Sequence, residues 1–223
     1  MSTKRRPSRT AIGNDSNAAL TRCSVPGCGR LPEKRQGDGL SPTLCRYHRE
    51  FKARHGSAFC RSPTGRQVRP YLGIAEAYVA EHLNDATIRH SLEQLKRHLE
   101  TAGRIPSVAE LPILSAEQKA RGVLARLRES DVPPDRILAV TLGVMAAIKE
   151  QYVQPGGDYA KVAVAKALKR RASGNHGVYG PDSRWDHYPE SRGRFLVELG
   201  AMTSEALTFR TWRRRTRVVR VSS

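Results

Sequence analysis

Hydrophobic residues follow a helical spacing along the chain from Tyr71 onward. The clearest row has spacings of four, three and four, which places its members on one face of a helix: Ile88, Leu92, Leu95 and Leu99. Asn84 or Asp85 can cap the start of this helix, and Gly103 can end it. The pattern therefore predicts an amphipathic helix between Asp85 and Gly103.

Three further helices are predicted in the second half of the chain. Ser115 followed by Gln118 matches a capping box that opens a helix through Leu127. The prolines at 133–134 begin a strongly apolar helix, which the Pro-Gly-Gly run at 155–157 ends. Asp158 can cap a helix through Val162, Ala165 and Leu168, with a basic end at residues 169–171.

The C-terminal part shows weaker signals. Residues 174–189 are rich in Gly, Asn, Pro and Asp and predict a loop. A short helix around Phe195 to Leu199 is expected to end near Gly200, and Ser204 with Glu205 can open another that carries Phe209 and Trp212. The β-branched residues of 216–221 favour a short strand.

The N-terminal part differs from this helical region. Residues 1–20 are polar and basic and cannot bury a core, which predicts a disordered arm. Residues 21–56 also hold few hydrophobic side chains, so they need another source of stability. The roughly 150 residues from Tyr71 onward can bury one core of moderate size. We therefore predict a mainly α fold with an arm (1–20), a small module (21–57) and a helical domain (71–223).

Four metal-ligand side chains can stabilise the small module: Cys23, Cys28, Cys45 and His48. A Pro-Gly turn at 26–27 lets the first two thiolates converge, and residues three apart share one face of the helix that begins near Cys45. Zn²⁺ prefers four such ligands in a tetrahedron, and four protein ligands leave no open position for substrate. The predicted zinc is therefore structural. His55 is an alternative ligand only if the helix unwinds, and Cys60 is expected to be a free or packed thiol.

This stretch resembles a short treble-clef-type Cys3His zinc finger found in phage and mobile-element proteins. The pattern is two cysteines, a basic loop, Leu-Cys-x-x-His and a basic helix ending in Gly, matched by Cys23, Pro26, Gly27, Cys28, Arg30, Leu44, Cys45, His48, Arg54 and Gly56. The resemblance covers about residues 22–56 and implies a zinc site in a phage or mobile-element protein. Two features depart from the pattern: Tyr47 precedes His48 where an aromatic usually follows it, and the insert at 33–43 is long.

The charge is large and unevenly distributed. The chain has 39 Lys and Arg against 21 Asp and Glu, a formal charge of +18 and a pI near 10.5. Residues 1–70 carry a net +11, residues 71–160 a net −2, and residues 161–223 a net +9. Two basic ends flanking a neutral middle favour a polyanionic partner, nucleic acid before membrane. No apolar run reaches the roughly 18 residues of a membrane span, and the N-terminus lacks a secretory signal, so we expect a cytoplasmic protein with reduced thiols.

Three basic runs are the candidate nucleic-acid contacts. They are Arg46, Arg49, Lys52 and Arg54 after the zinc ligands; Lys169, Arg170 and Arg171 at a helix end, with Lys166 before them; and Arg213, Arg214 and Arg215 near the C-terminus. Arginine binds phosphate through paired hydrogen bonds, and such contacts position a protein without reading bases. We therefore predict a protein that binds nucleic acid, with double-stranded DNA the first choice.

Two alternatives stay open. Fingers of this type often accompany endonuclease domains, and His176, Asp186 and His187 could build a metal-dependent nuclease or nicking site. No spacing there matches a known catalytic signature, so no catalytic residue is assigned. The other alternative is an RNA-binding or protein-interaction adaptor in which zinc shapes a docking surface for a protein partner.

Overall fold

A computed structural model describes residues 22–32, 43–150, 157–172 and 191–205 of the chain. These residues form seven α-helices and one 3-10 turn, with no β-strand among them. The helices are α1 (Arg46–His55), α2 (Gly65–Glu81), α3 (Ala86–Glu100), α4 (Ala116–Glu129), α5 (Pro134–Lys149), α6 (Tyr159–Lys169) and α7 (Arg194–Glu205), and the 3-10 turn is η1 (Val108–Glu110). The predicted mainly α fold is confirmed.

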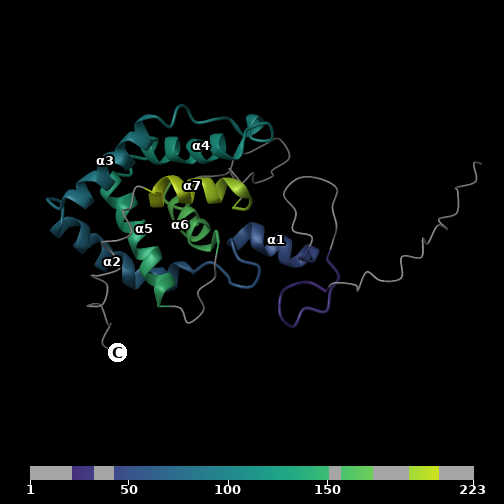
Figure 1. The fold of residues 1–223 in the computed structure, drawn as a ribbon. Helices are drawn as coiled ribbons and strands as arrows, with labels where there is room; N and C mark the ends of the chain where they lie inside the picture. Colours follow the sequence, from purple (N-terminus) through teal and green to yellow (C-terminus); the bar gives the residue numbers. More distant parts are fainter. Residues whose placement is uncertain (1–21, 33–42, 151–156, 173–190, 206–223) are drawn as a thin grey trace, which may run out of the picture.

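Helices α2 to α7 form a bundle, and α1 lies at one side of it (Figure 1). Within the bundle α2 packs along α5, α3 packs against α4 and α5, and α7 lies between α4 and α6. Helix α1 contacts the bundle through α6. The loop that carries the first two cysteines lies at the far end of α1 (Figure 1). None of the described helices is long and apolar enough to span a bilayer.

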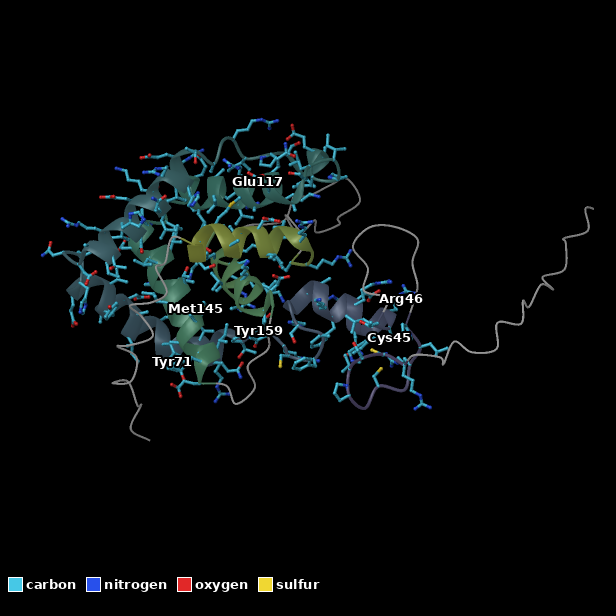
Figure 2. The ribbon with its side chains drawn as sticks, in the orientation of Figure 1. Cys45, Arg46, Tyr71, Glu117, Met145 and Tyr159 are labelled. Atoms are coloured by element: carbon cyan, nitrogen blue, oxygen red, sulfur yellow. The ribbon has the colours of Figure 1, made fainter. Side chains whose placement is uncertain are left out.

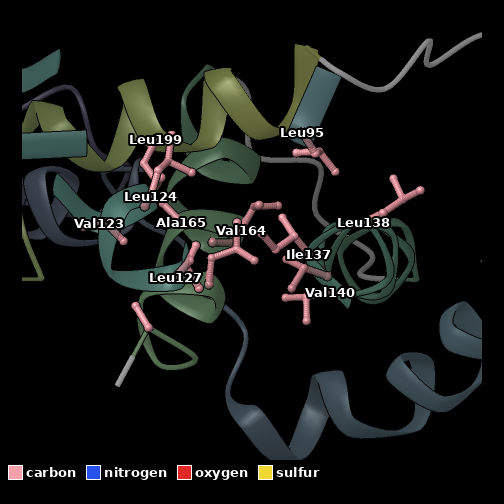
Figure 3. Packing of buried hydrophobic residues seen from close by; sticks show 14 of the residues in the cluster. Leu95, Val123, Leu124, Leu127, Ile137, Leu138, Val140, Val164, Ala165 and Leu199 are labelled. Atoms are coloured by element: carbon pink, nitrogen blue, oxygen red, sulfur yellow. The ribbon is translucent and has the colours of Figure 1, made fainter. Parts of the chain in front are cut away.

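The core lies where α4, α5, α6 and α7 meet (Figure 3). Every residue of α5 from Ile137 to Val144 is buried, which explains why this helix is apolar on all sides. Leu124 and Leu127 of α4 and Leu199 of α7 contribute fully buried side chains. Burial of these aliphatic groups supplies the main stabilising free energy of the bundle.

Local capping signals located several helix starts correctly. The Asp85 carboxylate caps α3 by accepting a hydrogen bond of 2.8 Å from the Thr87 N–H. Ser115 and Gln118 form the predicted capping box of α4, which runs two residues past Leu127. Helix α5 begins at Pro134 as expected, but ends at Lys149, before the Pro-Gly-Gly run. Asp158 stands at the N-cap position of α6 without a side-chain cap hydrogen bond.

The predicted helix end at Gly200 is wrong. Helix α7 continues through Gly200 to Glu205, the last described residue, so Ser204 and Glu205 belong to this helix and do not open a new one. A Cβ at Gly200 would lie 2.1 Å from the carbonyl oxygen of Lys161. The glycine therefore marks a close crossing of α7 over α6, not a helix terminus. Phe209, Trp212, the expected strand at 216–221 and the expected loop at 174–189 lie outside the described residues.

Helix α2 begins before the region that the hydrophobic pattern marked as helical. It starts at Gly65, where Thr64 and Gln67 form a capping box, and it includes Pro70. Only a short segment, residues 56–64, separates it from α1. The predicted module and the helical part are thus joined closely, and the contacts of this junction determine how the candidate site is held.

Candidate metal centre

Two local structures bring the four predicted ligands together. Val25 to Cys28 form a tight turn in which the Cys28 N–H donates to the Val25 carbonyl at 3.0 Å. Gly27 takes a φ of +77°, which the third position of a Pro-Gly type II turn requires. Cys45 occupies the N-cap position of α1 and His48 lies on its first turn. Figure 2 shows Cys45 at the end of α1 that points away from the bundle.

The ligand atoms converge on one point. The Cys23 sulfur lies 3.3 Å from Nδ1 of His48, and the Cys45 sulfur lies 3.5 Å from the same nitrogen. The sulfurs of Cys28 and Cys45 are 3.9 Å apart. All four ligand atoms lie within 4.8 Å of one another, and all three cysteines are free thiols. This Cys3His cluster could hold a metal ion.

The electrostatics of the cluster favour a bound cation. Burial raises the pKa of Cys23, but backbone N–H donors from Cys45 and Val25, together with His48, bring that pKa down to about 6. The backbone N–H of Arg30 lowers the pKa of Cys28, yet burial and the sulfurs of Cys45 and Cys23 raise it above the ordinary value overall. The thiolate form is thus favoured at Cys23 and disfavoured at Cys28. A metal cation removes this competition because it stabilises several thiolates at once.

The cluster has a small core of its own. Cys23, Leu44 and Cys45 are buried together, with Val25, Cys28 and Ala58 packed against them. This group is separate from the core of the bundle. Few apolar side chains contribute to it, so a metal ion held by these ligands would add much to the stability of residues 22–32 and 43–56.

Helix α1 is fixed to the bundle at its C-terminal end. Gly56 ends the helix with a φ of +73°, and a Cβ there would lie 2.6 Å from the carbonyl oxygen of Asp158, at the start of α6. The Gly193 N–H donates to the carbonyl of Ala53 at 2.9 Å. Tyr159, fully buried at the junction in Figure 2, donates its hydroxyl to the carbonyl of Arg61 at 2.7 Å. These contacts hold α1 and the following segment against α6.

The remaining histidine and cysteine of this region have other partners. Nδ1 of His55 accepts a hydrogen bond of 3.1 Å from the Ser62 N–H, so this histidine buttresses the junction and is not part of the cluster. Burial, followed by the charges of Lys166, Arg61 and Arg54, lowers the pKa of His55 to about 4. Cys60 is a free thiol that packs against the core of the bundle.

The predicted basic contacts fall into different environments. Arg46, Lys52 and Arg54 of α1 are exposed and Arg49 is half-buried, while Arg46 pairs with Glu50 at 3.2 Å. Arg170 and Arg171 are exposed at the end of α6, but Lys169 is buried and donates to the Ser191 hydroxyl at 2.9 Å. Arg213, Arg214 and Arg215 lie outside the described residues, as do His176, Asp186 and His187 of the nuclease hypothesis.

Sequence reasoning missed three arginines between the module and the bundle. Arg61, Arg66 and Arg69 are exposed on the junction and on the first turns of α2. Arg61, Arg54 and Lys166 are close enough to act together on the pKa of His55. The spacing of three between Arg66 and Arg69 would have placed both on one helix face, had the helix been expected to start before Tyr71.

Comparisons of this chain with protein-family models, with curated proteins and with solved structures find no match.

Proposed function

We propose that the chain binds nucleic acid, with double-stranded DNA as the first choice, and that a structural Zn²⁺ holds one of its contact surfaces. The observation that carries the proposal is the position of α1. This helix begins at two metal ligands, ends against the bundle, and carries exposed cations between those two fixed points.

Geometry supports zinc as the ion. Ideal zinc–ligand bonds in a tetrahedron put two thiolates about 3.8 Å apart and a thiolate and an imidazole nitrogen about 3.6 Å apart. The sulfurs of Cys28 and Cys45 are 3.9 Å apart, and Nδ1 of His48 lies 3.5 Å from the Cys45 sulfur and 3.3 Å from the Cys23 sulfur, with all four ligand atoms within 4.8 Å of one another. Three soft thiolates and one imidazole also match the ligand preference of zinc. Since the four ligands fill the coordination sphere, the role of the ion is structural.

The exposed basic side chains of α1 and of the end of α6 are suited to bind phosphate groups. Arg46, Lys52 and Arg54 lie on an exposed helix that also bears Arg49, and Arg170 and Arg171 extend the positive surface on α6. The residue types suit phosphate oxygens, and each phosphate neutralised releases counterions. Lys169 is left out of this contact set because it is buried. The resemblance to fingers of phage and mobile-element proteins supports a role in such an element.

The test is a salt titration of the full chain with a duplex of mixed sequence. Duplex affinity should fall linearly on a double-logarithmic plot as salt rises, with a slope of roughly −0.9 for each phosphate neutralised. Replacing Lys52 and Arg54 together with Gln should flatten this slope by about two. The matched control replaces Lys96 and Arg97 of α3 with Gln, which removes the same charge from the neutral middle of the chain.

Two results would overturn the proposal. One is undetectable duplex binding at low salt; the other is an equal change of slope in the Lys52/Arg54 variant and in the Lys96/Arg97 control. Competition with single-stranded DNA and structured RNA identifies the preferred nucleic acid, and preferred binding of RNA would replace duplex DNA in the proposal.

A further inference from the structure

A second feature of the bundle is a groove between α2, α5 and α6, with a volume of about 420 Å³. Its floor is aliphatic and consists of Val68, Leu72, Val140, Val144, Ala163 and Ala167. Pro63 and Gly65 also line it, together with four basic side chains, called here the groove cations: Arg69, Lys166, Arg170 and Arg171. No carboxylate and no side-chain hydroxyl or amide lines the groove in the described part of the chain.

Some basic side chains of the bundle pair with a nearby glutamate and others do not. Ion pairs join Lys96 to Glu100 on α3, Arg121 to Glu117 on α4 and Arg194 to Glu198 on α7. No ion pair is formed by any of the groove cations with another described residue. Among the described residues, their positive charge is therefore concentrated at the groove without an ion-paired carboxylate.

Lys166 is the most constrained of the groove cations. It is half-buried, and burial lowers its pKa, with Arg170 and Arg54 lowering it further. An ammonium group that is partly removed from water and surrounded by like charges is unfavourable by itself. A bound anion would relieve both effects, because it supplies the missing counter-charge and hydrogen-bond acceptors.

The aliphatic groove floor determines which kind of group the ligand has besides its anionic head. Its aliphatic side chains have no group that can hydrogen-bond to a sugar or a base edge, and a polar ligand group buried there would stay unsatisfied. A bare phosphate would leave the floor unused. The complementary molecule therefore has an anionic head and a hydrocarbon body.

We propose that this groove binds an amphiphilic anion, with a carboxylate or phosphate head held by the groove cations and a hydrocarbon body lying on the groove floor. This site goes beyond nucleic-acid binding, since a phosphate backbone has no hydrocarbon chain that could pack on the aliphatic floor of the groove. Carboxylate and phosphate heads share the chemistry of the site, and the experiment below separates them.

Isothermal titration calorimetry of the full chain, without nucleic acid, tests this site. Decanoate and decyl phosphate are the probes, and the tighter of the two identifies the head group. One molecule should bind per chain, and octanoate should bind roughly tenfold more weakly than decanoate because two methylene groups are lost. Decanol lacks the charge and inorganic phosphate lacks the hydrocarbon, so each should bind at least about tenfold more weakly than the matching probe.

Two variants separate the head from the body of the ligand. Lys166→Met keeps the aliphatic stem and removes the charge, and should weaken the tighter probe at least about tenfold. Ala167→Phe fills the groove and should weaken it similarly; its circular dichroism reports whether the bundle stays folded. Lys96→Met, on the exposed face of α3, is the matched control and should leave binding unchanged.

Three outcomes overturn the site: no binding of either probe at millimolar concentration, equal affinity for decanoate and decanol, or equal effects of Lys166→Met and Lys96→Met. Because no nucleic acid is present, such a failure leaves the duplex-binding proposal unaffected. Loss of duplex binding in the salt titration would in turn leave this site standing.

Discussion

The contact between Gly56 and the start of α6 gives a sharp prediction about how the metal centre is attached to the bundle. In a Gly56→Ala variant the new Cβ meets two costs. The residue has a φ of +73°, where an L-residue costs about 1–2 kcal/mol, and the Cβ would lie 2.6 to 2.8 Å from backbone atoms of Asp158 and Tyr159. Backbone atoms cannot rotate away, so overpacking adds roughly 1–3 kcal/mol.

Gly103→Ala is the matched control. Gly103 has a similar φ of +81°, but a Cβ there meets nothing within 4 Å, so only the backbone cost of about 1–2 kcal/mol applies. The free energy of unfolding, measured by urea titration of both variants, should thus fall further for Gly56→Ala by roughly 1–3 kcal/mol. Equal losses in the two variants would refute the close contact between the end of α1 and α6.

Three other predictions concern the metal, pH and helix packing. Cys45→Ser, or a strong zinc chelator, should remove hydrogen-exchange protection from α1 while the bundle stays protected, because the two have separate cores; simultaneous loss in both would contradict this. The lowered pKa of His55, about 4 against 6.5, favours its neutral form in the folded state, so its contribution to stability is complete above pH 6.5 and is lost as the pH falls towards 4. The quantity to measure is the unfolding free energy of the wild type minus that of His55→Gln. As the pH falls from 6.5 towards 4, this difference should decrease by less than about 1.4 kcal/mol per pH unit, the limit for one proton, because the ring is partly solvated. A difference that does not change with pH would disprove the lowered pKa of His55. Gly200→Ala should destabilise the protein by roughly 1–3 kcal/mol or more, since its Cβ would meet the α6 backbone. Gly73→Ala, exposed in α2 with open space around it, should stabilise the protein by up to about 1 kcal/mol. Thermal denaturation in which both variants shift the melting temperature in the same direction would exclude the close crossing of α7 over α6.

Features that depend on near neighbours in the chain were predictable from the sequence. The caps of α3 and α4 are contacts between residues two or three positions apart, and the starts of both helices followed from them. The ligand set followed from spacing too, since Cys45 and His48 lie on one helical turn. Each of these signals is local, and no distant residue has to be known to read it.

Features that depend on distant residues were not predictable in the same way. A glycine near the end of an apolar run usually stops a helix, but Gly200 is there because the backbone of α6 passes close by. The docking of α1 against α6 likewise joins residues about a hundred positions apart, such as Gly56 and Asp158. The start of helix α2 at Gly65 was not predicted, and Pro70 inside this helix is a residue that normally disfavours a helix interior.

The burial of Lys169 is an intermediate case. It was grouped with Arg170 and Arg171 as one basic run on the surface. Its spacing from Val162 and Ala165, however, places it on the buried face of α6, where its ammonium bonds to Ser191. Helical periodicity applied to the charged residues, and not only to the apolar ones, would have separated Lys169 from its neighbours.

The clamped junction between α1 and α6 has a consequence for selectivity. Were the two helices joined by a loose tether, Arg46 and Arg171 could engage a partner one after the other, at an effective concentration determined by tether length. The contacts of Gly56, Gly193 and Tyr159 make both arginines parts of one rigid body. Under the proposed nucleic-acid binding, a polyanion would gain from engaging both arginines only when its own charges recur at the matching separation, so selectivity would depend on charge spacing as well as on charge.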